Sequence, residues 1–167
     1  MQHQTDQSFK LNSKDIKDGL PLPAAQVYDR FGCSGGNQSP HLEWSEAPAG
    51  TESFAVTVYD PDAPSGSGWW HWVVFDIPAS VSELRSGAGQ AGRLPDCAKH
   101  GRNDYGSSDF GGACPPPGDK PHRYVFTVHA LKTAKLDVPV DATSAMIGFM
   151  LKANTLATAT LTAIYGR

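Results

Sequence analysis

The feature that most constrains this chain is a proline-stiffened corner between two apolar runs. The corner is Asp60-Pro61-Asp62-Ala63-Pro64, and it lies between the runs at 54–59 and 72–77. Proline fixes its own φ and pushes the residue before it toward extended backbone. The two carboxylates therefore have little conformational freedom, which suits side chains that must be aimed as well as an ordinary tight turn. The pattern predicts a strand-to-strand corner that carries acidic side chains.

Hydrophobic periodicity predicts a mainly β protein. Six to eight strands are indicated, including 9–11, 26–31, 42–44, 54–59, 70–77, 122–131 and 157–165. One amphipathic helix is expected after Asp141 as its N-cap. Its apolar face follows helical spacing through Ala142, Met146, Phe149, Ala153 and Leu156. A chain of 167 residues favours one domain, 1–167. We expect a two-sheet β-sandwich with Greek-key-type connections and one or two peripheral helices.

Charge and composition exclude several classes of protein. The net charge is -3, and no basic stripe suits a nucleic-acid backbone. No apolar run approaches the length that spans a bilayer, and the polar N-terminal stretch lacks the apolar core of a secretion signal. The cysteines, Cys33, Cys97 and Cys114, are odd in number and widely spaced, which is typical of free thiols in a reducing compartment. These observations predict a cytoplasmic protein.

A glycine- and proline-rich stretch covers residues 86–120. It contains eight glycines and four prolines and has no persistent periodicity. Such long connections in compact domains usually carry function or are disordered, and the aromatic residues Tyr105 and Phe110 argue against disorder. Residues 87–92 match G-x-G-x-x-G and residues 32–36 match G-x-S-x-G, but neither segment opens a helix. We therefore expect plain loops at both.

Two of the histidines begin strong apolar strands. His71 and His122 each follow a Gly- or Pro-rich loop, whereas His41 and His100 lie in polar contexts and are expected at the surface. Alternation along the strand that begins at His122 places His122 and Tyr124 on one face. The same alternation places His71 on one face with Val73 and Phe75 of its own strand. If the two strands are neighbours, one concave rim carries two imidazoles and a phenol. The alternative is two buried histidines, each bonded to a backbone carbonyl. Spacing alone favours this alternative, because it cannot show that the two strands are neighbours.

Four short motifs stand in order along the chain: 60–64, Trp70-His71-Trp72, Pro115-Pro116-Pro117-Gly118 and His122-Arg123-Tyr124. Together they resemble the phosphatidylethanolamine-binding protein family, which includes the Raf kinase inhibitor proteins. Residues 39–44 and 154–167 extend the likeness, which is closer to the bacterial branch and spans nearly the whole chain. The resemblance implies a β-sandwich with peripheral helices and a small anion-binding pocket near one edge.

The resemblance also implies which residues line that pocket: Asp60, His71, Cys114, Pro116, His122 and Tyr124. Four others are expected to support the pocket structurally: Asp62, Pro64, Trp70 and Arg123. Eukaryotic members add a C-terminal helix that contributes a further tyrosine, whereas this chain ends in a predicted strand. A more open pocket is therefore expected, and the lipid and kinase partners of the eukaryotic members are not transferred.

The expected function is binding of a small anion, such as phosphate, a carboxylate or a phospholipid headgroup, with a regulatory role and no catalysis. Imidazole and phenol donors that converge suit an anion. Asp60 is expected either to accept a bond from one imidazole and favour its charged form, or to be itself protonated. Affinity should then rise as the pH falls from about 8 to 6, around the ordinary histidine pKa of roughly 6.5. No metal or cofactor is expected.

Two alternatives stay open on the same residues. His71, His122 and Asp60 would also suit acid–base hydrolysis or a two-histidine, one-carboxylate metal centre. Residues 86–120 would otherwise suit the contact surface of a kinase or protease inhibitor. Exposed aromatic residues near the corner would suit a homodimer.

Overall fold

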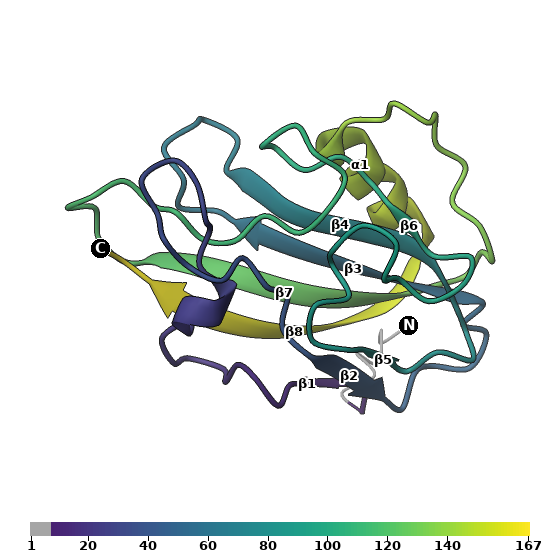
Figure 1. Ribbon diagram of the computed structural model, residues 1–167. Coiled ribbons are helices and arrows are strands. Elements are labelled where there is room, and N and C mark those ends of the chain that lie inside the picture. The colour runs from purple at the N-terminus through teal and green to yellow at the C-terminus, as the bar shows by residue number, and fades with distance from the viewer. Residues whose placement is uncertain (1–7) are drawn as a thin grey trace.

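Five antiparallel strands form the main sheet. The computed structural model describes residues 8–167, and the strands lie in the order β6-β4-β3-β7-β8 (Figure 1). In that order their bounds are Lys99–His100, Trp69–Pro78, Ser53–Asp60, His122–Leu131 and Thr155–Tyr165. The central strand, β3, is buried on both faces, as its continuous apolar run predicts.

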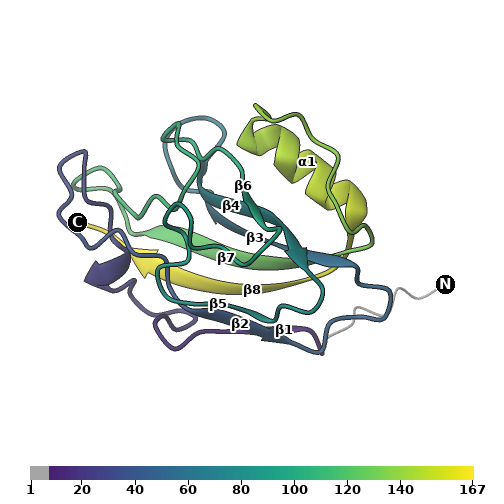
Figure 2. The ribbon, with the colours of Figure 1, turned by 45° about the vertical axis from the view of Figure 1, so that its right-hand side comes forward.

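A smaller sheet covers one face of the main sheet. Its strands, in the order β1-β2-β5, are Lys10–Asn12, Leu42–Ser45 and Glu83–Leu84. Figure 2 shows this sheet lying below β7 and β8. Leu42 and Trp44 point into the space between the sheets, as period two predicts, and share one apolar core with Phe54 and Phe126 of the main sheet. The protein is therefore the expected two-sheet sandwich.

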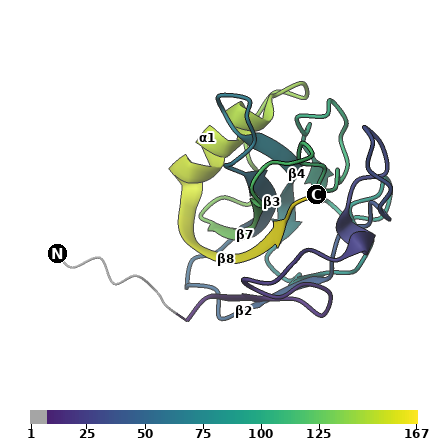
Figure 3. The same ribbon diagram turned by 90° about the vertical axis from the view of Figure 1, so that its left-hand side faces the viewer.

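One α-helix, α1 (Ser144–Asn154), covers the opposite face of the main sheet, and Figure 3 shows α1 and β2 on different sides of that sheet. The predicted apolar face of this helix is wrong, because Ile147 and Leu151 are buried while Met146 and Phe149 are exposed. Packing explains the difference. A Cβ added at Gly148 would lie 3.1 Å from the Trp70 ring, so the helix presents its glycine side to the sheet.

Two further local predictions are wrong. The N-cap of α1 is Thr143, whose hydroxyl accepts a backbone N–H of the first turn, and not Asp141. Residues 26–31 do not form a strand, and a short 3-10 helix, η1 (Ala24–Gln26), ends where the predicted strand was to begin. No helix within residues 8–167 has the length and hydrophobicity to cross a membrane.

The connection from β6 to β7 crosses the end of the main sheet. β6 lies beside β4, whereas β7 lies on the far side of β3, so residues 101–121 pass from one edge strand over two strands. This Greek-key-type crossing covers the end at which β3 finishes and β4 and β7 begin, on the left in Figure 1. The missing periodicity of residues 101–121 therefore reflects a wall built over strand ends, whereas residues 86–98 connect β5 to β6.

Candidate functional site

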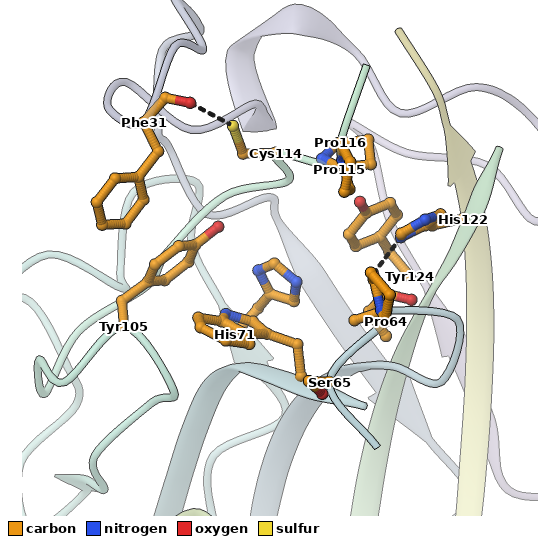
Figure 4. Close-up of a pocket in the computed structure, with 13 residues that line it drawn as sticks. Phe31, Pro64, Ser65, His71, Tyr105, Cys114, Pro115, Pro116, His122 and Tyr124 are labelled. Atoms are coloured by element: carbon orange, nitrogen blue, oxygen red, sulfur yellow. Dashed lines mark hydrogen bonds and ion pairs between the residues drawn. The ribbon is translucent and has the colours of Figure 1, made fainter. Parts of the chain in front are cut away.

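A pocket of about 260 Å³ opens at this end of the main sheet (Figure 4). It brings together all six residues that were expected to line it: Asp60, His71, Cys114, Pro116, His122 and Tyr124. Seven others complete the lining: Phe31, Ala63, Pro64, Ser65, Trp69, Tyr105 and Pro115. The strands supply a polar floor, and the loops supply a largely apolar rim.

A β-bulge in β4 directs His71 into the pocket. The residues on either side of His71 pair with consecutive residues of β3, so His71 itself is an extra residue without a partner there. Period two predicts His71 on the face of Val73, under α1, and this is wrong. The bulge moves His71 to the face of Tyr124, with 5.2 Å between the ring centroids. β4 and β7 are not neighbours, because β3 lies between them.

His71 is a buried imidazole with a fixed tautomer. Its Nδ1–H donates to the Gly111 carbonyl at 2.8 Å, and a carbonyl can only accept. Burial lowers the pKa of His71 to about 4, although the carbonyl and the nearby Asp60 carboxylate act in the opposite direction. The prediction of a charged imidazole is therefore wrong for His71. The alternative of a histidine bonded to a backbone carbonyl holds, yet the ring still faces the pocket (Figure 4).

His122 bridges two carboxylates. Its Nδ1 bonds to Oδ2 of Asp60 at 2.7 Å, and its Nε2 bonds to Oδ2 of Asp119 at 3.0 Å. Burial alone would lower the pKa of His122, but the two hydrogen bonds and the two negative charges outweigh it and raise the pKa. The expectation that Asp60 accepts a bond from one imidazole and favours its charged form is confirmed for His122.

The two carboxylates of the corner do different things. Oδ1 of Asp60 accepts the backbone N–H of Asp62 at 2.8 Å, which fixes the turn that follows β3. Asp62 lies outside the pocket lining and pairs with Arg123 through bonds of 2.9 and 3.0 Å, and the guanidinium lowers the pKa of Asp62 to about 2. This pair ties the corner to β7. Trp70 also lies outside, against α1, whereas Pro64 is part of the lining itself.

Tyr105 is a pocket residue that the sequence did not single out as a site residue. Figure 4 shows its ring on one side of His71 and Tyr124 on the other. The Tyr105 hydroxyl donates to the Gly112 carbonyl at 2.8 Å, and its ring centroid lies 5.6 Å from that of His71. Burial raises the pKa of both phenols, so both keep their protons. The one available signal was an aromatic residue inside a glycine-rich segment.

A disulfide ties two loops of the rim together. Cys33 and Cys114 are bonded, with their Cα atoms 5.9 Å apart, so the prediction of three free thiols is wrong. Cys97 is the free cysteine of the described residues, and it is exposed. The two cysteines are 81 residues apart in the sequence, and nothing in their spacing indicated that they pair. The bond holds the loop of Phe31, which is 71% exposed, against the wall that contains Pro115.

The one close cluster of potential metal-ligand side chains in the described part of the chain lies away from the pocket. Within residues 8–167, the one group of three such side chains whose ligand atoms lie within 4.8 Å of one another is His41, Glu43 and Glu83. His41 was expected at the surface but is buried. His100 was also expected at the surface and is half-buried in β6. Nδ1 of His41 accepts the Lys14 N–H at 3.1 Å, so Nε2 carries the proton that faces Glu83. His41 therefore has no lone pair to offer a metal.

Comparisons with known proteins agree with this geometry. The family model described as phosphatidylethanolamine-binding protein matches residues 12–166. The Escherichia coli protein YbcL is 55% identical over 160 residues, which cover 95% of this chain and 87% of that protein. The E. coli protein YbhB is 48% identical over 158 residues, covering 94% and 99%. The crystal structure of YbcL, described as a new member of the mammalian PEBP family, matches with a TM-score of 0.94 and 54% identity, covering 96% of this chain and 99% of that one.

Proposed function

Because the chain belongs to the phosphatidylethanolamine-binding protein family, we propose that it binds a small ligand with a phosphate or other anionic headgroup in this pocket. The observation that supports this most is the convergence of His71, His122 and Tyr124, from strands that do not adjoin, in about 260 Å³. Small-molecule sites are concave and largely apolar, with a few placed polar groups. Free phosphate and a phospholipid headgroup share the chemistry that this floor would recognise.

In this proposal His122 and Tyr124 attract and orient the anion. His122 supplies positive charge, and the Tyr124 hydroxyl supplies a donor that burial keeps protonated. The Asp119 side chain is 39% exposed, so a ligand oxygen can take its place on Nε2 of His122. The rim prolines and the disulfide hold the pocket in shape beforehand, which lowers the ordering cost of binding.

The proposed pH dependence differs from the one that the sequence predicted. That prediction relied on two imidazoles gaining charge between about pH 8 and 6, but the pKa of His71 is far below this range. His122 alone supplies the charge, and its pKa is raised. Affinity should therefore be complete below about pH 6.5 and should fall as the pH rises through the raised pKa of His122.

Calorimetric titration with inorganic phosphate and with phosphoethanolamine tests the proposal. Tyr124→Phe should weaken binding about fivefold, because one net hydrogen bond is lost. Tyr165→Phe is the matched control, since it removes a hydroxyl from the adjacent strand β8 outside the pocket lining. Absence of binding to the wild-type protein, or equal losses in the two variants, would contradict the proposal.

We propose binding and not catalysis, because the groups of the pocket are not arranged around an activated nucleophile. In the lining formed by the described residues, the one serine is Ser65, and its hydroxyl donates to the Gly68 carbonyl. Nδ1 of His71 and both ring nitrogens of His122 are already bonded to protein acceptors. Nε2 of His71 is the one ring nitrogen left open to a ligand, and the Ser65 hydroxyl donates to a backbone carbonyl and not to that nitrogen.

The crossing segment, residues 101–121 between β6 and β7, is proposed to be a wall of this pocket and not a surface that binds a protein partner. Phe110 is buried, and the Gly111 N–H donates to the His71 carbonyl at 2.9 Å, so the segment is part of the domain's interior. Regulation would then follow from occupancy of the pocket. Association with a kinase, a protease or a second copy of the chain has no observation of its own in its favour and is not part of the proposal.

The disulfide also bears on the compartment in which the protein is located. The predicted cytoplasmic location rested in part on free thiols, and Cys33 and Cys114 are bonded. We propose an oxidising compartment instead, because disulfides form and persist there. Thiol labelling of protein taken directly from cells should then modify Cys97 alone, and modification of all three cysteines would contradict this placement.

A further inference from the structure

We propose that the pocket selects its ligand by a proton: His71 accepts a hydrogen bond from an O–H of the bound oxyanion. The site would then prefer phosphate, which retains a proton at neutral pH, over sulfate, which does not. This inference rests on the proposed function and narrows it. It concerns which anions fit the floor of the pocket, and it assigns His71 the role of an acceptor where an imidazole beside an anion would ordinarily donate.

The first step is the tautomer of His71. Nδ1 lies 2.8 Å from the Gly111 carbonyl, which has no hydrogen to give, so Nδ1 carries the ring proton. His71 is 3% exposed, and burial disfavours a second proton on the ring. Nε2 therefore carries a lone pair and no proton. Because the ring projects into the pocket, this lone pair is the part of His71 that a ligand can meet (Figure 4).

The second step is the surroundings of that lone pair. Asp60, 2% exposed, also lines the pocket, and its oxygens already accept from His122 and from a backbone N–H. A fully deprotonated anion would face both this carboxylate and the Nε2 lone pair of His71, and neither could donate to it. An oxyanion with one O–H avoids this conflict, because it can donate to His71 and accept from Tyr124.

The third step concerns the other imidazole. His122 cannot take the role of acceptor, because each of its ring nitrogens already faces a carboxylate, from Asp60 and from Asp119. The two histidines of the pocket therefore differ in kind. His122 supplies charge, which any anion would feel, and His71 supplies a lone pair, which only a ligand with a hydrogen can satisfy. Selectivity between anions of similar shape would come from His71.

The test compares sodium phosphate with sodium sulfate by calorimetry at about pH 7 and constant ionic strength, with the disulfide intact. Phosphate should bind at least about tenfold more tightly, because an unsatisfied buried acceptor is costly. In His71→Gln the side-chain amide can donate to the ligand, so the preference should fall to within about twofold. His129→Gln is the matched control, because His129 lies on β7 outside the lining and bonds to Thr57.

Equal binding of phosphate and sulfate by the wild-type protein would overturn the inference while leaving the proposed function in place. Absence of binding to both anions would overturn the proposed function and this inference with it. If His71→Gln weakened both anions by the same factor, the residue would be merely structural, and the inference would again be overturned. The wild-type comparison decides the matter even if the variant fails to fold.

Discussion

Replacing Asp60 with Asn should destabilise the protein strongly, and more at mildly acidic than at alkaline pH. Asn keeps the size of the side chain but removes the charge that lies 2.7 Å from Nδ1 of His122, in a pair whose side chains are 3% and 4% exposed. Leaving one partner of a buried ion pair uncompensated costs about 3–5 kcal/mol. Because Asp119 still bonds to Nε2 of His122, we expect the lower end, about 3 kcal/mol.

The pH dependence of this loss follows from His122. Its pKa is raised in the folded protein, so its stabilising contribution is complete below the unfolded value of roughly 6.5 and is lost as the pH rises through the folded value. Asp60→Asn removes much of that contribution. The loss in unfolding free energy should therefore be about 3 kcal/mol at about pH 6 and should shrink toward about 1 kcal/mol, the worth of an ordinary hydrogen bond, as the pH rises through the raised pKa of His122.

Urea unfolding followed by tryptophan fluorescence, in non-reducing buffer at about pH 6, 7.5 and 9, measures these free energies. Asp119→Asn is the matched control, because it makes the same substitution at the more exposed carboxylate of the same imidazole. It should cost less than about 1 kcal/mol. An Asp60→Asn loss that is constant across this range, or that grows toward alkaline pH, would refute the assignment of His122 as an imidazolium held by Asp60.

Two further predictions concern the disulfide between Cys33 and Cys114 and the helix α1. Replacing Cys33 and Cys114 together with Ser should lower the unfolding free energy by about 4 kcal/mol, since the bond closes a loop of 81 residues, and a change below about 1 kcal/mol in urea unfolding would contradict the pairing. Ile147→Ala should cost about 2–5 kcal/mol because its side chain is buried. Phe149→Ala, at a position 74% exposed, should change stability by less than about 0.5 kcal/mol, and the reverse order in the same assay would favour the apolar face that the sequence predicted.

Much of the sandwich could be predicted because strands bury alternate residues. Ala159, Leu161 and Ala163 are buried along β8, as the alternation with threonine predicts. The apolar face of α1 could not be predicted in the same way, because the helix carries apolar side chains on more than one side. The side that faces the sheet packs against residues far away in the chain, among them Trp70 beside Gly148.

The site was predictable where a short motif carries its residues, and not where it depends on contacts between distant segments. The corner at Asp60 and the strand that begins at His122 could be located from such motifs, and both contribute to the pocket. The bulge at His71 is a one-residue offset between two strands, which no spacing within β4 reveals. Tyr105 and the disulfide of Cys114 depend on where the crossing segment runs, and its composition does not determine that path.

The division between a floor built on strand ends and a rim built on loops makes this scaffold adaptable. Strands β3, β4 and β7 hold the polar groups of the floor in place through sheet pairing, whereas residues 61–68 and 112–118 contribute to the opening as connections outside the sheet. Loops accept changes in length and composition far more readily than paired strands do. Grafting new sequences onto those two connections would therefore alter the shape of the opening while the polar floor stayed constant.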